Sequence, residues 1–135
     1  MATIRNEYLG GLRTRATHLK SGNSIITDAP VDNQGKGEAF SPSDLVATAL
    51  GSCMLTLMGI AANTHGIEIE GTKLETTKVM GTDPRRIVRL DVSFTFPAGK
   101  NYSDKEKAIL EKAAVTCPVY YSLDPDIEKD IQFNW

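Results

Sequence analysis

Two cysteines, Cys53 and Cys117, are the residues of this chain best suited to chemistry, and they stand 64 positions apart. Cys53 lies in an apolar run rich in small residues, and Cys117 directly precedes a proline. Such thiols can form a bridge, bind a metal or pass through a redox cycle, or they can be ordinary buried core residues. A reactive thiol beside a second, resolving thiol is typical of peroxide reduction, so the pair predicts redox catalysis.

A nucleophilic thiol needs a positive charge nearby, because burial alone raises the pKa of a cysteine. The helix expected around Cys53 has no such charge. Arg13 and Arg15 are the candidates, since alternation along a strand places both on one face. The alternative for each arginine is a solvated surface charge.

The dipeptide Cys117-Pro118 predicts a second feature of the site. Proline is favoured at the first position of a helix, which would make Cys117 the N-cap of a short helix. A helix N-terminus stabilises negative charge, so we expect it to favour a thiolate at Cys117. The alternative is a core cysteine at a kink.

Composition excludes several classes of protein. The chain has 135 residues, a net charge of -2 and no basic tract, which argues against a nucleic-acid partner. The four soft metal ligands, Cys53, Cys117, His18 and His65, have no short ligand spacing, so we expect no metal or organic cofactor.

The stretch Leu45–Ala62 carries no charge and is long enough to cross a membrane. It lacks flanking Lys, Arg or aromatic residues, and we interpret it as a helix buried in the centre of a domain or a dimer, with no membrane contact. The first residues lack the apolar segment of a signal peptide, which predicts a cytoplasmic protein.

The order of elements predicts an α+β fold with antiparallel sheets around a buried central helix, in one domain over residues 1–135. A helix should begin after the N-cap Ser41 and run to about Asn63, and a second should begin after Ser103. Strands are expected before and after the central helix and at the C-terminus, over residues 3–9, 12–19, 24–30, 66–81, 86–96 and 126–135.

Three ordered motifs, YLGGLRTRA, GKGEAFSPSDLVATALGSC and TCPVYYSL, give the chain a resemblance to the OsmC/Ohr family of osmotically inducible and organic hydroperoxide resistance proteins. The resemblance implies an intertwined α+β homodimer with sites at the subunit interface. It also implies a thiol peroxidase that reduces organic hydroperoxides and is recycled by a dithiol. Cys53 matches the peroxidatic cysteine and Cys117 the resolving cysteine, which together form a disulfide. The activating arginine matches Arg13, with Arg15 left open.

One position departs from this pattern. Many family members have a glutamate directly after the proline that begins the helix, where this chain has Ser43. Asp44 follows, and Glu38 in the preceding loop could substitute. The departure leaves open an OsmC-like binding protein for a hydrophobic small molecule, or another thiol reaction on an electrophile. An apolar pocket around Leu45, Met54 and Leu57, with Phe40 as a further candidate, would suit either a hydrophobic ligand or an organic hydroperoxide.

Overall fold

The computed structural model describes every residue from Met1 to Trp135 and divides the chain into two compact units, Met1–Val46 and Ala47–Trp135. The first unit is a three-stranded antiparallel sheet in the order β1-β2-β3. Its strands are β1 (Ile4–Gly10), β2 (Arg13–His18) and β3 (Ser24–Asp28). The loop that follows contains one short 3₁₀ helix, η1 (Val31–Asn33).

Local turn chemistry sets the register of this sheet. Gly10, the last residue of β1, and Gly11, in the turn to β2, both have positive φ, which glycine adopts without strain. The next turn is closed by hydrogen bonds between His18 and Asn23 and between Gly22 and His18. The β2–β3 register that results places Arg13 directly opposite Asp28.

The long helix α1 (Pro42–His65) begins as the sequence predicts. Ser41 Oγ accepts from the Asp44 amide at 3.1 Å, and Asp44 Oδ2 accepts from the Ser41 amide at 2.9 Å. This is a reciprocal capping box in which Asp replaces the usual Glu. The helix ends before Gly66, whose φ is +65°.

A single chain buries only part of α1, so its expected burial in the centre of a dimer stays a prediction. One face is buried, at positions spaced by three and four residues: Ala47, Leu50, Gly51, Met54, Met58 and Ala62. Ile60 is 57% exposed on another face. The helix is also long and apolar enough to cross a bilayer, a property that core helices of soluble proteins share.

The second sheet has the order β4-β5-β6, with strands β4 (Lys73–Gly81), β5 (Arg86–Thr95) and β6 (Glu128–Asn134). β4 and β5 are antiparallel, but β5 and β6 are parallel, so the prediction of antiparallel sheets is wrong for β6. The physical reason is the connection, since two helices lie between β5 and β6 and return the chain to the same end of the sheet. The strand expected over 66–81 begins only at Lys73, because a turn at Thr72 precedes it.

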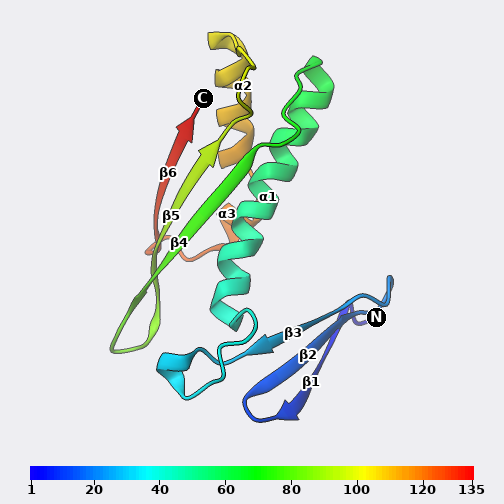
Figure 1. Cartoon of the computed structure of the whole chain (residues 1–135), viewed down its shortest axis with the longest axis vertical. Coiled ribbons are helices and arrows are strands. Elements are labelled where there is room, and N and C mark those ends of the chain that lie inside the picture. Colours follow the sequence, from blue (N-terminus) through cyan, green and yellow to red (C-terminus); the bar gives the residue numbers. More distant parts are fainter. The chain divides into compact units, whose positions relative to one another are not determined.

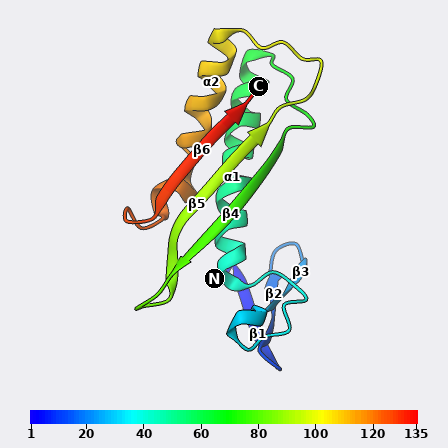
Figure 2. The same ribbon diagram turned by 60° about the vertical axis from the view of Figure 1, so that its left-hand side comes forward.

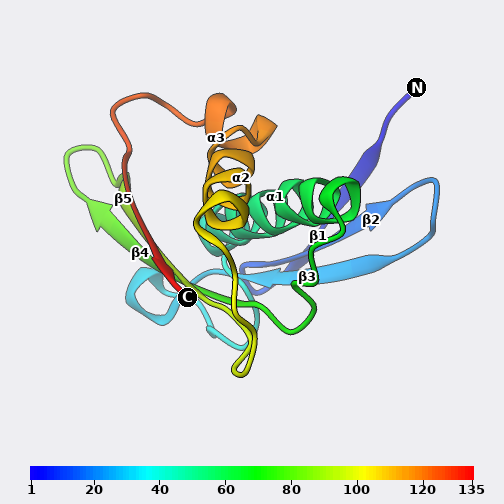
Figure 3. The same cartoon turned by 90° about the horizontal axis from the view of Figure 1, so that it is seen from above.

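Those two helices are α2 (Asp104–Val115) and α3 (Pro118–Ser122). The predicted capping box of α2 is present, with Ser103 and Glu106 each accepting from the other's amide. Within the second unit, α1 and α2 cover the same face of the sheet (Figures 1, 2 and 3). The core lies between these layers and includes Leu90, Val92 and Phe94, which alternate along β5.

Candidate active site

The second unit holds both thiols, and neither is in a disulfide. Cys53 is partly exposed on α1, whereas Cys117 is completely buried before α3. Burial is the main cause that raises the pKa of Cys117, and the neighbouring Cys53 thiol raises it further. The structure therefore brings together two cysteines that are 64 residues apart in sequence.

Cys117 is the N-cap of α3, as predicted from Pro118. Its Sγ accepts a hydrogen bond from the Tyr120 amide at 3.2 Å. Burial raises the pKa of Cys117, and the helix N-terminus lowers it as predicted, through the Tyr120 amide, but by less, so the expectation of a favoured thiolate at Cys117 is wrong for the balance of the two effects. Cys117 is thus a buried, protonated thiol at neutral pH, and Cys53 is the thiol that solvent reaches.

The first unit holds a second chemical cluster, centred on Arg13. Arg13 Nε donates to Asp28 Oδ1 at 2.7 Å, and Nη2 donates to Asp28 Oδ2 at 2.9 Å. The Asp28 side chain is completely buried, and that of Arg13 is 30% exposed. The Arg13 hydrogen bond is the main cause that lowers the pKa of Asp28, against the effect of burial.

Sequence reasoning missed Asp28. The signal was available, because the turn around Gly22 fixes the pairing of β2 with β3 and places Asp28 opposite Arg13. Counting back from that turn would have paired the two residues. Their burial, however, depends on packing that the strand patterns do not contain.

Arg15 lies in a different environment from Arg13. It stands opposite Glu7 on β1, and its Nη1 lies 3.4 Å from Glu7 Oε1. These side chains are 48% and 63% exposed, so the pair is a surface ion pair that water screens. The acidic partners therefore distinguish the two arginines, which alternation along the strand alone could not do.

The two candidate carboxylates also differ. Glu38 joins the Arg13 cluster, with its Oε2 3.7 Å from Arg13 Nη2 and its amide donating to Asp28 Oδ2 at 3.2 Å. The Asp44 carboxylate instead accepts from the Ser41 amide in the helix cap. The structure therefore places Glu38 beside Arg13 and gives Asp44 a capping role.

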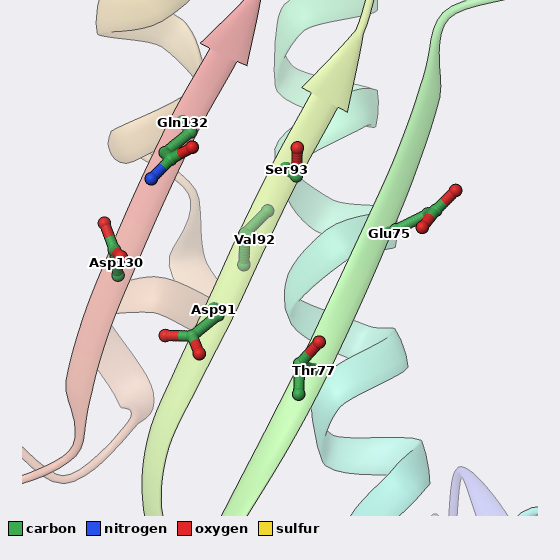
Figure 4. A pocket seen from close by; sticks show the side chains of 7 residues that line it. All are labelled: Glu75, Thr77, Asp91, Val92, Ser93, Asp130 and Gln132. Atoms are coloured by element: carbon green, nitrogen blue, oxygen red, sulfur yellow. The ribbon is translucent and has the colours of Figure 1, made fainter.

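The predicted apolar pocket needs one correction. Met54 is fully buried in the core, so it does not line an accessible surface. A groove on the outer face of the second sheet is polar instead, and neither cysteine lines it (Figure 4). No group of three or more His, Cys, Asp or Glu side chains is arranged to hold a metal ion.

Comparison with known proteins places this arrangement in context. A family model described as OsmC-like protein matches residues 35–132. The crystal structure of a protein from Psychrobacter arcticus 273-4, named as an osmotic stress induced and detoxification response protein, is 52% identical, with a TM-score of 0.94 over 99% of this chain and 96% of that one.

Two more distant structures share the fold. An organic hydroperoxide resistance protein OsmC from Legionella pneumophila is 17% identical, with a TM-score of 0.73 over 100% of this chain and 98% of that one. An organic hydroperoxide resistance protein from Elizabethkingia anophelis is 16% identical, with a TM-score of 0.75 over 99% and 96%. The search of curated proteins finds no match.

Proposed function

Because the chain belongs to the OsmC-like protein family, we propose that it is a thiol-dependent peroxidase that reduces organic hydroperoxides to alcohols. The observation that carries this proposal is the thiol pair, in which an accessible Cys53 adjoins a buried Cys117. Relatives of the same fold are named for organic hydroperoxide resistance, and the similar Psychrobacter protein is named for stress and detoxification.

The proposed reaction has two steps at sulfur. The Cys53 thiolate attacks the terminal oxygen of ROOH and breaks the O–O bond, and the alkoxide takes a proton and leaves as ROH. Cys53 is left as a sulfenic acid. The Cys117 sulfur then attacks the Cys53 sulfur, and the sulfenic hydroxyl leaves as water with the Cys117 proton. A dithiol reduces the Cys53–Cys117 disulfide by exchange and is itself oxidised to a disulfide.

Burial suits Cys117 to the resolving step. Its side chain is completely buried, so a peroxide reaches the partly exposed Cys53 and not Cys117. Its place at the start of α3 holds the sulfur close to Cys53 before oxidation. Arg13 is the proposed cation that stabilises the Cys53 thiolate and polarises the leaving oxygen.

The test is one equivalent of cumene hydroperoxide added to the reduced protein, followed by intact mass and free-thiol measurement. We expect the loss of two hydrogen atoms and both thiols. Cys53→Ser should abolish peroxide consumption, and Cys117→Ser should spare one turnover and block recycling. Unchanged thiols in the unmodified protein would refute the peroxidase and favour a binding protein for hydrophobic molecules.

We also propose that the protein works as a cytoplasmic homodimer. Two free thiols suit a reducing compartment. The face of α1 that carries Ile60 is uncharged and exposed, and a second copy would remove it from water. Light scattering coupled to size-exclusion chromatography tests the dimer, and a monomeric mass would refute it.

A further inference from the structure

We propose that Lys129 is a positioning residue for Cys117, because it fixes the short helix α3 against strand β6. The fixed helix keeps the Cys117 sulfur enclosed in the core and beside Cys53. This inference rests on the proposed function, in which Cys117 is the resolving thiol that must react with Cys53 and with nothing else. All the residues concerned lie within the unit Ala47–Trp135.

Lys129 is a charged residue on the side of β6 that faces the core. Side chains alternate between the two faces of a strand, and Lys129 shares its face with Ile131 and Phe133, which pack against the hydrophobic core. A lysine at such a position loses hydration, so its ammonium needs partners within the protein.

Two contacts hold the Lys129 ammonium. Its Nζ donates a hydrogen bond to the Ile127 carbonyl at 3.0 Å, and it lies 5.0 Å from the centroid of the Tyr120 ring. A cation within about 6 Å of an aromatic centroid is attracted to the face of the ring. Lys129 therefore joins strand β6 to helix α3, on which Tyr120 lies.

Tyr120 transmits the effect of Lys129 to the sulfur. Its ring receives the ammonium, while its backbone amide donates to Cys117 Sγ at 3.2 Å. Cys117 is also the N-cap of α3, and its carbonyl accepts from the Tyr121 amide at 3.3 Å. A helix of five residues has little stability of its own, so contacts such as that of Lys129 must hold it in place.

An inward-facing lysine can serve another purpose, which is to keep the edge of a sheet from pairing with another chain, and β6 is the last strand of its sheet. That role requires the charge but no particular partner, and it predicts aggregation when the charge is lost. The contact with Tyr120 favours the positioning role, which predicts instead that Cys117 becomes easier to reach.

The experiment measures the second-order rate of Cys117 alkylation by iodoacetamide at neutral pH, in a Cys53→Ser background. Lys129→Met keeps a side chain of similar length and removes the charge. We expect it to speed alkylation about two- to five-fold, the factor that a partly exposed cation–π contact contributes to an opening equilibrium. Lys107→Met removes the other lysine–aromatic contact of this unit, 5.9 Å from the Trp135 ring, and is the matched control that should leave the rate unchanged. An unchanged rate in Lys129→Met would overturn the proposal.

Two further variants show whether the ammonium acts through the ring. Lys129→Arg keeps a cation that binds aromatic faces, so its rate should stay close to that of the Lys129 protein. Tyr120→Leu removes the ring but keeps the amide that bonds to Cys117 Sγ. In that background Lys129→Met should cause no further increase, because the contact is already absent. A full increase there, or a Lys129→Arg protein as fast as Lys129→Met, would contradict the proposal.

Urea separates the release of α3 from a loss of stability of the whole protein. Opening of one short helix exposes little surface, so Cys117 alkylation in Lys129→Met should depend only weakly on low urea concentrations. A steep dependence, parallel to global unfolding, would show a general destabilisation and overturn the proposal.

The positioning role and the proposed peroxidase can fail separately. The alkylation measurements use one thiol and no peroxide, so a negative result there refutes the role of Lys129 and leaves the peroxidase standing. Unchanged thiols after addition of cumene hydroperoxide would refute the peroxidase while the faster alkylation of Cys117 in Lys129→Met remained.

Discussion

Unequal reactivity of the two thiols is the most direct consequence of this structure. We predict that iodoacetamide modifies Cys53 rapidly and Cys117 at least about 100-fold more slowly. The perturbation is a pair of variants, Cys53→Ser and Cys117→Ser, each of which leaves one thiol to be followed. The cause is burial, since the Cys117 side chain has no accessible surface and Cys53 is partly exposed.

The magnitude follows from what must open before Cys117 can react. Displacing α3 breaks the bond from the Tyr120 amide to Sγ, worth about 1 kcal/mol. It also removes Lys129 from the Tyr120 ring, 5.0 Å away, at a cost of about 0.5–1 kcal/mol. Removing Val119 and Tyr120 from the core brings the total free energy of opening to about 3 kcal/mol. Each 1.4 kcal/mol is a factor of ten in the equilibrium between the closed and the open state. The accessible fraction of Cys117 is then about one per cent.

The assay is quenched alkylation followed by intact mass, at several pH values. Because the pKa of Cys117 is raised, its labelling should keep increasing at alkaline pH after a normal thiol has reached its plateau. Labelling of Cys117 within about five-fold of Cys53 at neutral pH would refute the reasoning, since that ratio corresponds to only about 1 kcal/mol of protection.

The remaining predictions concern stability and assembly. Because the pKa of Cys117 is raised in the folded protein, the thiol loses its proton at a lower pH in the unfolded chain than in the folded one. The free energy of unfolding should therefore fall above about pH 8.5, and urea titration of Cys117→Ala should show a smaller fall. The lowered pKa of Asp28 affects stability in acid. The melting temperature should drop as the pH falls below about 4, and it should drop less in Asp28→Asn. Ile60→Asp should halve the mass measured by light scattering. Ser103→Ala should cost about 1 kcal/mol in urea titration, and an unchanged midpoint would refute the cap.

The helix starts could be predicted from sequence because they depend on a few neighbouring residues. Ser41 with Asp44, and Ser103 with Glu106, satisfy amide donors within one turn. The N-cap position of Cys117 followed from Pro118 for the same reason. Local chemistry of this kind needs no knowledge of the packing around it.

The wrong predictions concern features that depend on contacts between distant parts of the chain. The last strand alternates in the same way whether it is parallel or antiparallel, and only its place beside β5 sets its direction. The pKa of Cys117 also depended on two opposing effects, a helix start that lowers it and burial that raises it. The dipeptide Cys117-Pro118 reveals the helix start, whereas the burial comes from the core residues that enclose the sulfur.

The choice between the two arginines shows the same division between local pattern and packing. Alternation gives Arg13 and Arg15 equivalent places on β2, so nothing within that strand distinguishes them. Their partners do, because Asp28 is buried and Glu7 is exposed. An exposed ion pair exchanges readily with water, while a buried carboxylate that loses its cation is left with an uncompensated charge. Arg13 is therefore the arginine whose guanidinium is held in a single orientation.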